Sequence, residues 1–107
     1  MKICVPAKAE GLSADMDSRF GRCAYFVFVD SQTGEVKSMK NPSANADRGA
    51  GVSAAQLVLD EGAQVVVSEN LGGHAKEVLQ ESDIKIIELS AEKVSEAIEL
   101  AKQKLGL

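Results

Sequence analysis

Positively charged side chains gather in two parts of the chain that show no regular pattern. All three arginines, Arg19, Arg22 and Arg48, lie in or beside these stretches, whereas most of the lysines are scattered over the regular segments. Guanidinium groups bind anions through a planar fork of N–H donors. In a chain of net charge −4, the three arginines therefore predict a local positive site. The alternative interpretation is that they are solvated loop residues.

Cys23 and His74 are the two side chains whose positions suit a metal ligand. Cys23 directly follows the segment that contains Arg19 and Arg22. Nearby guanidinium groups favour the thiolate, which is the form that binds soft metals. His74 is the only histidine and stands at the start of a predicted helix, where imidazole can bind a metal or an anion. Both have a simpler interpretation, Cys23 as a small buried residue and His74 as a surface residue.

The familiar patterns of structural metal sites and hydrolases are missing. Cys4 and Cys23 do not form a C-x-x-C pair, so no structural zinc site is encoded, and Cys4 is expected to be a core residue. A single histidine without paired carboxylates nearby disfavours a mononuclear zinc or non-haem iron site. No G-x-S-x-G segment is present to place a nucleophilic serine. We therefore expect a binding protein and not an enzyme.

Two glycine pairs stand at the starts of predicted helices. The segment from Gly49 to Ala54 matches the G-x-G-x-x-A form of the dinucleotide fingerprint. That fingerprint requires a strand directly before its first glycine, and here an irregular stretch precedes it. We therefore interpret Gly49 and Gly51, and likewise Gly72 and Gly73, as residues that leave backbone N–H groups open to an anion at a helix N-terminus.

Length, composition and charge limit the classes of protein. With 107 residues, 45% of them hydrophobic and 26% charged, the chain is expected to form a single domain over residues 1–107. The excess of acidic residues disfavours binding to nucleic acid or to an anionic membrane surface. No apolar run approaches the ~20 residues of a membrane-spanning helix. The N-terminal residues lack a signal-peptide pattern, and two unpaired cysteines favour the reducing cytoplasm.

The hydrophobic pattern predicts a mixed α/β architecture. Apolar and β-branched runs predict strands over residues 2–6, 24–30, 36–40, 63–67 and 84–89, of which the second and third form a hairpin. A first helix starts at Val52, with Val52, Ala55, Val58 and Leu59 on its buried face, and ends near Gly62. A second helix begins near Gly73. Ser90 is expected to cap a third helix, whose apolar face holds Val94, Ala97, Ile98, Ala101 and Leu105.

The motifs together resemble the dinitrogenase iron–molybdenum cofactor biosynthesis family. The similarity covers nearly the whole chain, and its most specific part combines Asp17–Arg22 (DSRFGR) with Gly49–Gly51 (GAG). The other matching residues are Lys2–Pro6, Tyr25–Asp30, Asn41, Pro42, Gly62, Leu71–Ala75 and Leu79.

This resemblance implies a fold and a function. The implied fold is a ribonuclease H-like three-layer fold with a mixed five-stranded sheet. Nuclease activity is not implied, because the first strand lacks the carboxylate that two-metal nucleases use to hold a divalent ion. Members of the family resemble carriers that hold iron–sulfur or molybdenum-containing clusters during cofactor assembly, so cluster donor or acceptor proteins are the implied partners.

The leading hypothesis is a small cytoplasmic carrier of an anionic metal–sulfur cluster. Its predicted site lies between the two irregular stretches and the starts of the first two helices. The alternative is a phosphate- or nucleotide-binding domain that uses the Gly49–Gly51 loop with Arg48. A third hypothesis, a partner-binding module, predicts an exposed apolar patch.

Overall fold

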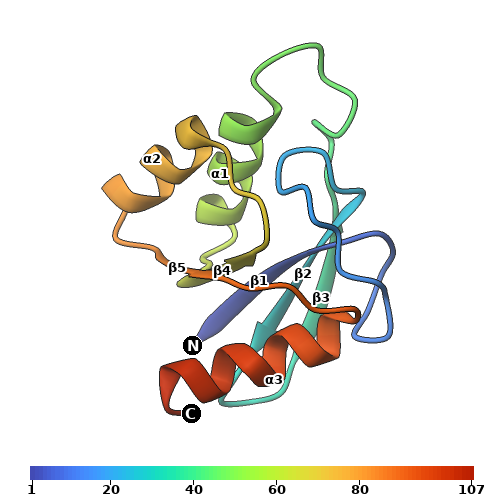
Figure 1. The fold of residues 1–107 in the computed structure, drawn as a ribbon, viewed down its shortest axis with the longest axis vertical. Helices are drawn as coiled ribbons and strands as arrows, with labels where there is room; N and C mark the ends of the chain where they lie inside the picture. Colours follow the sequence, from blue (N-terminus) through green and yellow to red (C-terminus); the bar gives the residue numbers. More distant parts are fainter.

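The computed structural model describes residues 1–107 and contains five strands and three helices (Figure 1). Their order along the chain is β1 (Lys2–Ala7), β2 (Tyr25–Asp30), β3 (Val36–Lys40), α1 (Ala50–Asp60), β4 (Val65–Ser68), α2 (Gly73–Glu81), β5 (Lys85–Glu88) and α3 (Val94–Leu105). The predicted α/β class and the order of its elements are therefore confirmed. No helix in the structure has the length and apolar character needed to cross a membrane.

The sheet is mixed, with the strand order β3-β2-β1-β4-β5. β2 is antiparallel to both of its neighbours, β1 and β3, whereas β1, β4 and β5 pair in parallel. The predicted hairpin is present in β2 and β3. Its turn is held by the Asp30 carboxylate, which accepts hydrogen bonds from the backbone N–H groups of Gln32 and Thr33, as short polar side chains do in turns.

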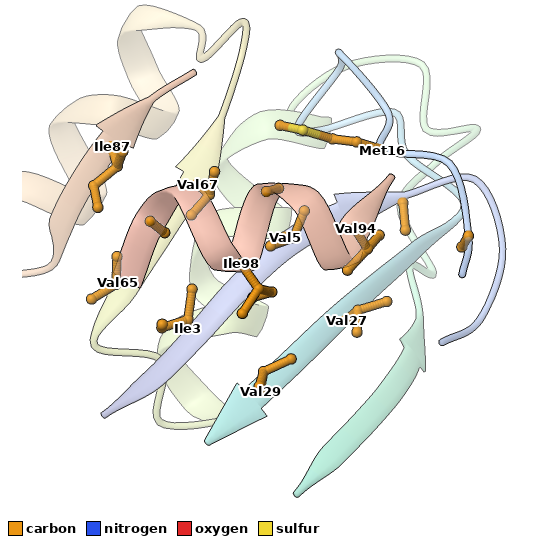
Figure 2. Close-up of a cluster of buried hydrophobic side chains, with 14 residues drawn as sticks. Ile3, Val5, Met16, Val27, Val29, Val65, Val67, Ile87, Val94 and Ile98 are labelled. Carbon is orange, nitrogen blue, oxygen red and sulfur yellow. The ribbon is translucent and has the colours of Figure 1, made fainter. Parts of the chain in front are cut away.

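Helices cover both faces of the sheet. Successive residues of a strand point to opposite faces, and in β1 this places Ile3 and Val5 under α3 and Cys4 under α1 and α2. Figure 2 shows the core beneath α3, where Val94 and Ile98 pack on Val27, Val67 and their neighbours. The second core contains Phe26, Phe28, Val58 and Leu79. Cys4 is fully buried in it, which confirms its predicted core position.

Two predicted helix starts are wrong in detail. α1 begins at Ala50, because Gly49 takes a left-handed conformation that turns the chain into the helix. Val52 then falls on the solvent side, with 41% of its surface exposed, and the buried face consists of Ala50, Ala54, Ala55 and Val58.

Ser90 does not cap α3, which starts four residues later at Val94. The reason is a tertiary contact with a distant part of the chain. The first irregular stretch passes beside this helix, and its Leu12 and Ala14 carbonyls accept hydrogen bonds from the N–H groups of Ser95 and Val94, at 3.0 and 2.9 Å. Those carbonyls occupy donors that a capping side chain would otherwise take.

The two irregular stretches and the starts of α1 and α2 lie at the same end of the sheet (Figure 1). We call this region the loop end; it comprises residues 8–24, 41–49 and 69–73. Backbone contacts hold its parts together. Arg19 forms an isolated parallel bridge with Asn70, and Gly21 lies against the first turn of α1.

Gly21 is the position where the backbones come closest. A Cβ atom at this residue would lie 2.8 Å from both the Cα and the N atom of Gly51, and 3.0 Å from the carbonyl carbon of Ala50. Those atoms belong to backbone in a helix and cannot move aside easily. Only glycine therefore fits at position 21.

This contact makes the Gly21→Ala variant a direct test of the packing. We expect its unfolding free energy to fall by about 1–3 kcal/mol, as for other overpacked positions, measured by urea denaturation. Gly73→Ala is the control, because a Cβ there meets nothing within 4 Å and alanine is favoured in a helix. Equal stability of the Gly21→Ala variant and the wild type would contradict the packing described here.

Candidate anion-binding site

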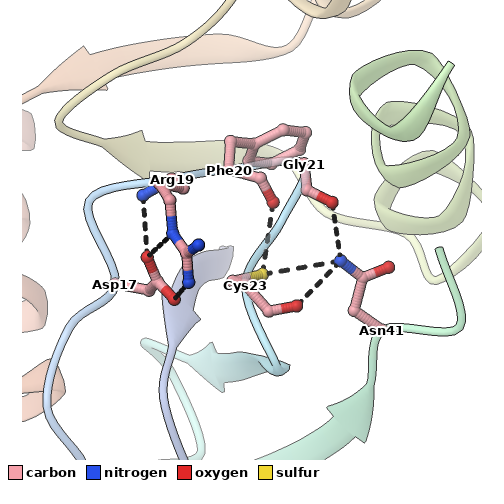
Figure 3. Close-up of polar contacts among 6 residues, drawn as sticks. All are labelled: Asp17, Arg19, Phe20, Gly21, Cys23 and Asn41. Atoms are coloured by element: carbon pink, nitrogen blue, oxygen red, sulfur yellow. Dashed lines mark hydrogen bonds and ion pairs between the residues drawn. The ribbon is translucent and has the colours of Figure 1, made fainter. Parts of the chain in front are cut away.

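A buried carboxylate fixes the position of Arg19 (Figure 3). Asp17 is only 2% exposed, and its carboxylate accepts hydrogen bonds from the Arg19 backbone N–H at 2.9 Å and from Nε and Nη2 of the guanidinium, each at 3.2 Å. Burial raises the pKa of Asp17, but the hydrogen bonds and charge of Arg19 outweigh it, so the pKa lies below its usual value of 3.8. The side chain of Arg19 is 64% exposed. Its positive charge is nevertheless balanced by the Asp17 carboxylate.

Arg22 joins the two irregular stretches. Its Nη1 donates hydrogen bonds to the carbonyl oxygens of Ala44, at 3.3 Å, and Ala46. These partners are neutral, so they orient the guanidinium without cancelling its charge. Arg22 is therefore an exposed cation held in place by backbone.

Cys23 is a buried thiol and not the predicted thiolate. Burial, followed by the nearby Asp17 carboxylate, raises the pKa of Cys23 to about 12. Its Sγ donates a hydrogen bond to the Phe20 carbonyl oxygen at 3.2 Å. The prediction that guanidinium groups lower this pKa is wrong, because Arg19 turns to Asp17 and Arg22 turns to the 44–46 backbone. A ligand role for Cys23 would thus require loss of a tightly held proton.

Asn41 is a buried residue that links the same two stretches. It is not among the site residues predicted from the sequence. It is 3% exposed, and its Nδ2 donates to the carbonyl oxygens of Gly21 at 3.0 Å and Cys23 at 2.9 Å. Its Oδ1 accepts a hydrogen bond from the Ser43 N–H at 3.1 Å. The signal that could have identified it is the Asn41-Pro42 pair directly after a predicted strand.

The N-termini of α1 and α2 lie side by side, and neither has a side-chain cap. A Cβ on Gly51 of α1 would lie 3.4 Å from the Cβ of Ala75 in α2. The first N–H groups that bond back into the helices belong to Ser53 and Lys76. The residues before them therefore leave backbone donors open at two adjacent positive helix ends.

Five of the predicted site residues are exposed at the starts of the two helices. Arg48 and Gly49 precede α1, Gly72 precedes α2, and Gly73 and His74 are the first two residues of α2. Gly51 differs, because Gly21 covers its amide side, which makes it a packing residue. Cys23 lies in the core and His74 on the surface, and the structure contains no group of three or more His, Cys, Asp or Glu side chains arranged to hold a metal.

The protonated state of Cys23 leads to a pH-dependent stability. An unfolded thiol titrates near its usual value of 9.0, whereas the folded Cys23 titrates near 12. Above pH 9 the unfolded state loses a proton that the folded state keeps. We therefore expect the unfolding free energy to fall as the pH rises from 9 to 12, by about 1.4 kcal/mol per pH unit for this thiol.

Urea denaturation at several pH values measures this slope in the wild type and in Cys23→Ala. The variant should show a shallower slope, and the Cys4 thiol, whose pKa burial also raises, should account for part of what remains. Identical slopes in the two proteins would show that Cys23 ionises as readily when folded as when unfolded.

Comparison with known proteins finds relatives over nearly the whole chain. A solved structure, the apo form of the orange protein from Desulfovibrio gigas, is 34% identical, with a TM-score of 0.88, and the match covers 98% of this chain and 88% of that one. The NMR structure of a putative NifB protein from Thermotoga is 27% identical, with a TM-score of 0.83 and coverage of 95% and 87%. The uncharacterized protein MJ0580 of Methanocaldococcus jannaschii is 29% identical over 103 residues, which are 94% of this chain and 84% of that protein.

A protein-family model also matches this chain. The model described as dinitrogenase iron–molybdenum cofactor matches residues 1–104, a range that includes every motif on which the sequence resemblance was based. The chain therefore belongs to the dinitrogenase iron–molybdenum cofactor family.

Proposed function

We propose that this protein is a non-catalytic carrier that binds an anionic iron–sulfur or molybdenum-containing cluster at its loop end. One observation carries the proposal. In a chain of net charge −4, all three arginines and two uncapped helix N-termini lie at one end of the sheet. Metal–sulfur clusters carry negative charge and accept hydrogen bonds at their sulfides, which matches this collection of donors.

The residues proposed to contact the cluster are those that supply charge or open N–H groups. They are Arg19, Arg22, Arg48, Gly49, Gly72, Gly73 and His74, with Cys23 and His74 as the proposed metal ligands; Gly51 is left out because Gly21 covers its amide side. Among them Arg22 and Arg48 form no ion pair, whereas Arg19 is balanced by Asp17. A site with two ligands at most holds a cluster weakly, and weak binding allows a carrier to release it.

The relatives support an accessory role. The family description concerns a nitrogenase cofactor, and the orange protein structure is described as an apo form. We extend these statements to this chain as a single domain without catalytic activity, which receives its cluster from a donor protein and passes it to an acceptor. Two free cysteines support a cytoplasmic location, where thiols stay reduced.

The strand order supports the ribonuclease H-like classification. The sheet β3-β2-β1-β4-β5 has β2 as its one strand antiparallel to the rest, and helices cover both faces. We propose this class for the fold without any nuclease activity, because β1 carries no carboxylate.

The alternative function, phosphate or nucleotide binding by the Gly49–Gly51 loop, receives less support. Under this hypothesis, the absence of a side chain on Gly51 would let a phosphate approach its backbone N–H group. In the structure Gly21 occupies that approach, with the Gly51 N atom 2.8 Å from the position of a Cβ at residue 21.

Anaerobic reconstitution with iron, molybdate and sulfide tests the carrier proposal. After desalting, we expect the protein to retain metal and sulfide and to absorb visible light. In the Arg22→Gln variant the retained metal should fall several-fold, because a free cation is removed. Lys104→Gln is the control, since it removes one exposed charge from the last turn of α3. Absence of retained metal in the wild type, or equal retention by the Arg22→Gln variant, would count against the proposal.

A further inference from the structure

A hollow of about 650 Å³ opens where β2 begins, β3 ends and the second irregular stretch starts. Arg22, Tyr25, Lys40, Asn41, Ala44 and Asn45 are among its lining residues. Small-molecule pockets measure about 300–1,000 Å³, so the hollow has room for a group of several metal and sulfur atoms. Of its lining residues, only Arg22 belongs to the predicted site.

The charge of this hollow distinguishes it from the others. Its two charged side chains, Arg22 and Lys40, are both positive, and neither forms an ion pair with a carboxylate. Two smaller hollows, of about 130 and 210 Å³, contain both acidic residues and lysines. The remaining one, of about 360 Å³, has no charged side chain. In a protein of net charge −4, a purely positive lining is suited to an anion.

Hydrogen bonds to backbone carbonyls hold part of the lining of this hollow in place. Asn41, which is buried, bonds to the Gly21 and Cys23 carbonyls, and Arg22 bonds to the carbonyls of Ala44 and Ala46. Tyr25 and Lys40 are directly opposite each other in the β2–β3 pairing, so their side chains lie on the same face of the sheet. The Arg22 guanidinium is therefore oriented before any ligand arrives, and the strand register fixes the face of the sheet on which Lys40 stands.

The helix N-termini offer less space. Tyr25 packs on the α3 side of the sheet, whereas α1 and α2 cover the opposite face. The start of α1 is in contact with the Gly21 backbone, and none of the four hollows is lined by residues of α1 or α2. Open N–H groups are present there, but a cavity for a cluster is not.

We propose that the hollow between Arg22 and Lys40 is the binding site of the anionic metal–sulfur cargo. This inference rests on the proposed carrier function and makes it more specific. The Lys40 ammonium and the Arg22 guanidinium attract the anion, and Tyr25 and Asn45 add neutral hydrogen-bonding groups. This inference narrows the wider set of residues proposed above: Arg22 alone of that set lines the hollow, and the helix N-termini add a favourable field at the loop end without contacting the cargo.

Titration of the full-length, ¹⁵N-labelled protein with tetrathiomolybdate under anaerobic conditions locates the binding site. This small molybdenum–sulfur dianion is the probe. We expect the amide signals of Ala24, Lys40 and Asn45 to shift most, and those of Gly73 and His74 to shift little. In Lys40→Gln the affinity for the probe should fall about tenfold, as for loss of a charge-assisted contact.

Lys85→Gln is the matched control, because Lys85 is an exposed strand lysine on β5, at the other edge of the sheet. An equal loss of affinity in this control would show that only the overall charge matters and would overturn the inference. Largest shifts at Gly73 and His74, with unchanged affinity in Lys40→Gln, would overturn it too. Equal affinity for inorganic phosphate would mark a general oxyanion site, which also contradicts the assignment to a metal–sulfur cargo.

Anaerobic reconstitution separates this inference from the proposed function. If the wild type retains a cluster and Lys40→Gln retains as much, the hollow is not the site but the carrier function stands. If the wild type retains no cluster, the carrier function fails, whatever the titration shows.

Discussion

The contact between Gly21 and the first turn of α1 is the constraint on which the arrangement of the loop end depends. It brings the backbone of the first irregular stretch against Gly51, at a distance that excludes any side chain on residue 21. On one side of this contact, the buried Asp17 carboxylate fixes Arg19. On the other, Asn41 and Arg22 join the first stretch to the second. Long segments without regular structure thereby take a defined position.

The distribution of charge follows from that arrangement. Arg22 and Lys40 come from different parts of the chain, yet the loop contacts and the β2–β3 register place both on one hollow. Their partners are backbone carbonyls or solvent, so their charges remain available. The helix N-termini at the same end contribute in the same direction. A protein that is acidic overall thus presents an anion with a hollow lined by two cations and no carboxylate.

Local patterns predicted the elements well because those patterns have local causes. Apolar and β-branched runs indicated the strands, and the turn residues around Gly34 indicated the β2–β3 hairpin. The two errors have different causes. At α1 the cause is local, because the left-handed Gly49 starts the helix at Ala50 and Val52 then faces solvent. At α3 the cause is distant, because the carbonyls of Leu12 and Ala14 take the donors that Ser90 was expected to cap.

The same distinction between local and distant causes applies to the site residues. The sequence pattern located the arginines in or beside the irregular stretches and the glycines at the helix starts, but it could not show where each guanidinium points. Asp17 balances Arg19, and burial keeps Cys23 protonated, so two of the predicted residues differ in chemistry from expectation. Lys40 and Asn41 entered the description only through pairing and packing.

Diffraction from crystals soaked with tetrathiomolybdate, recorded at the molybdenum absorption edge, shows where the cargo binds, because the anomalous signal locates the metal itself. We expect the strongest molybdenum peak in the hollow between Arg22 and Lys40. A strongest peak on the far end of the sheet, away from the loop end, or a fully soaked crystal without any ordered molybdenum, would contradict this expectation.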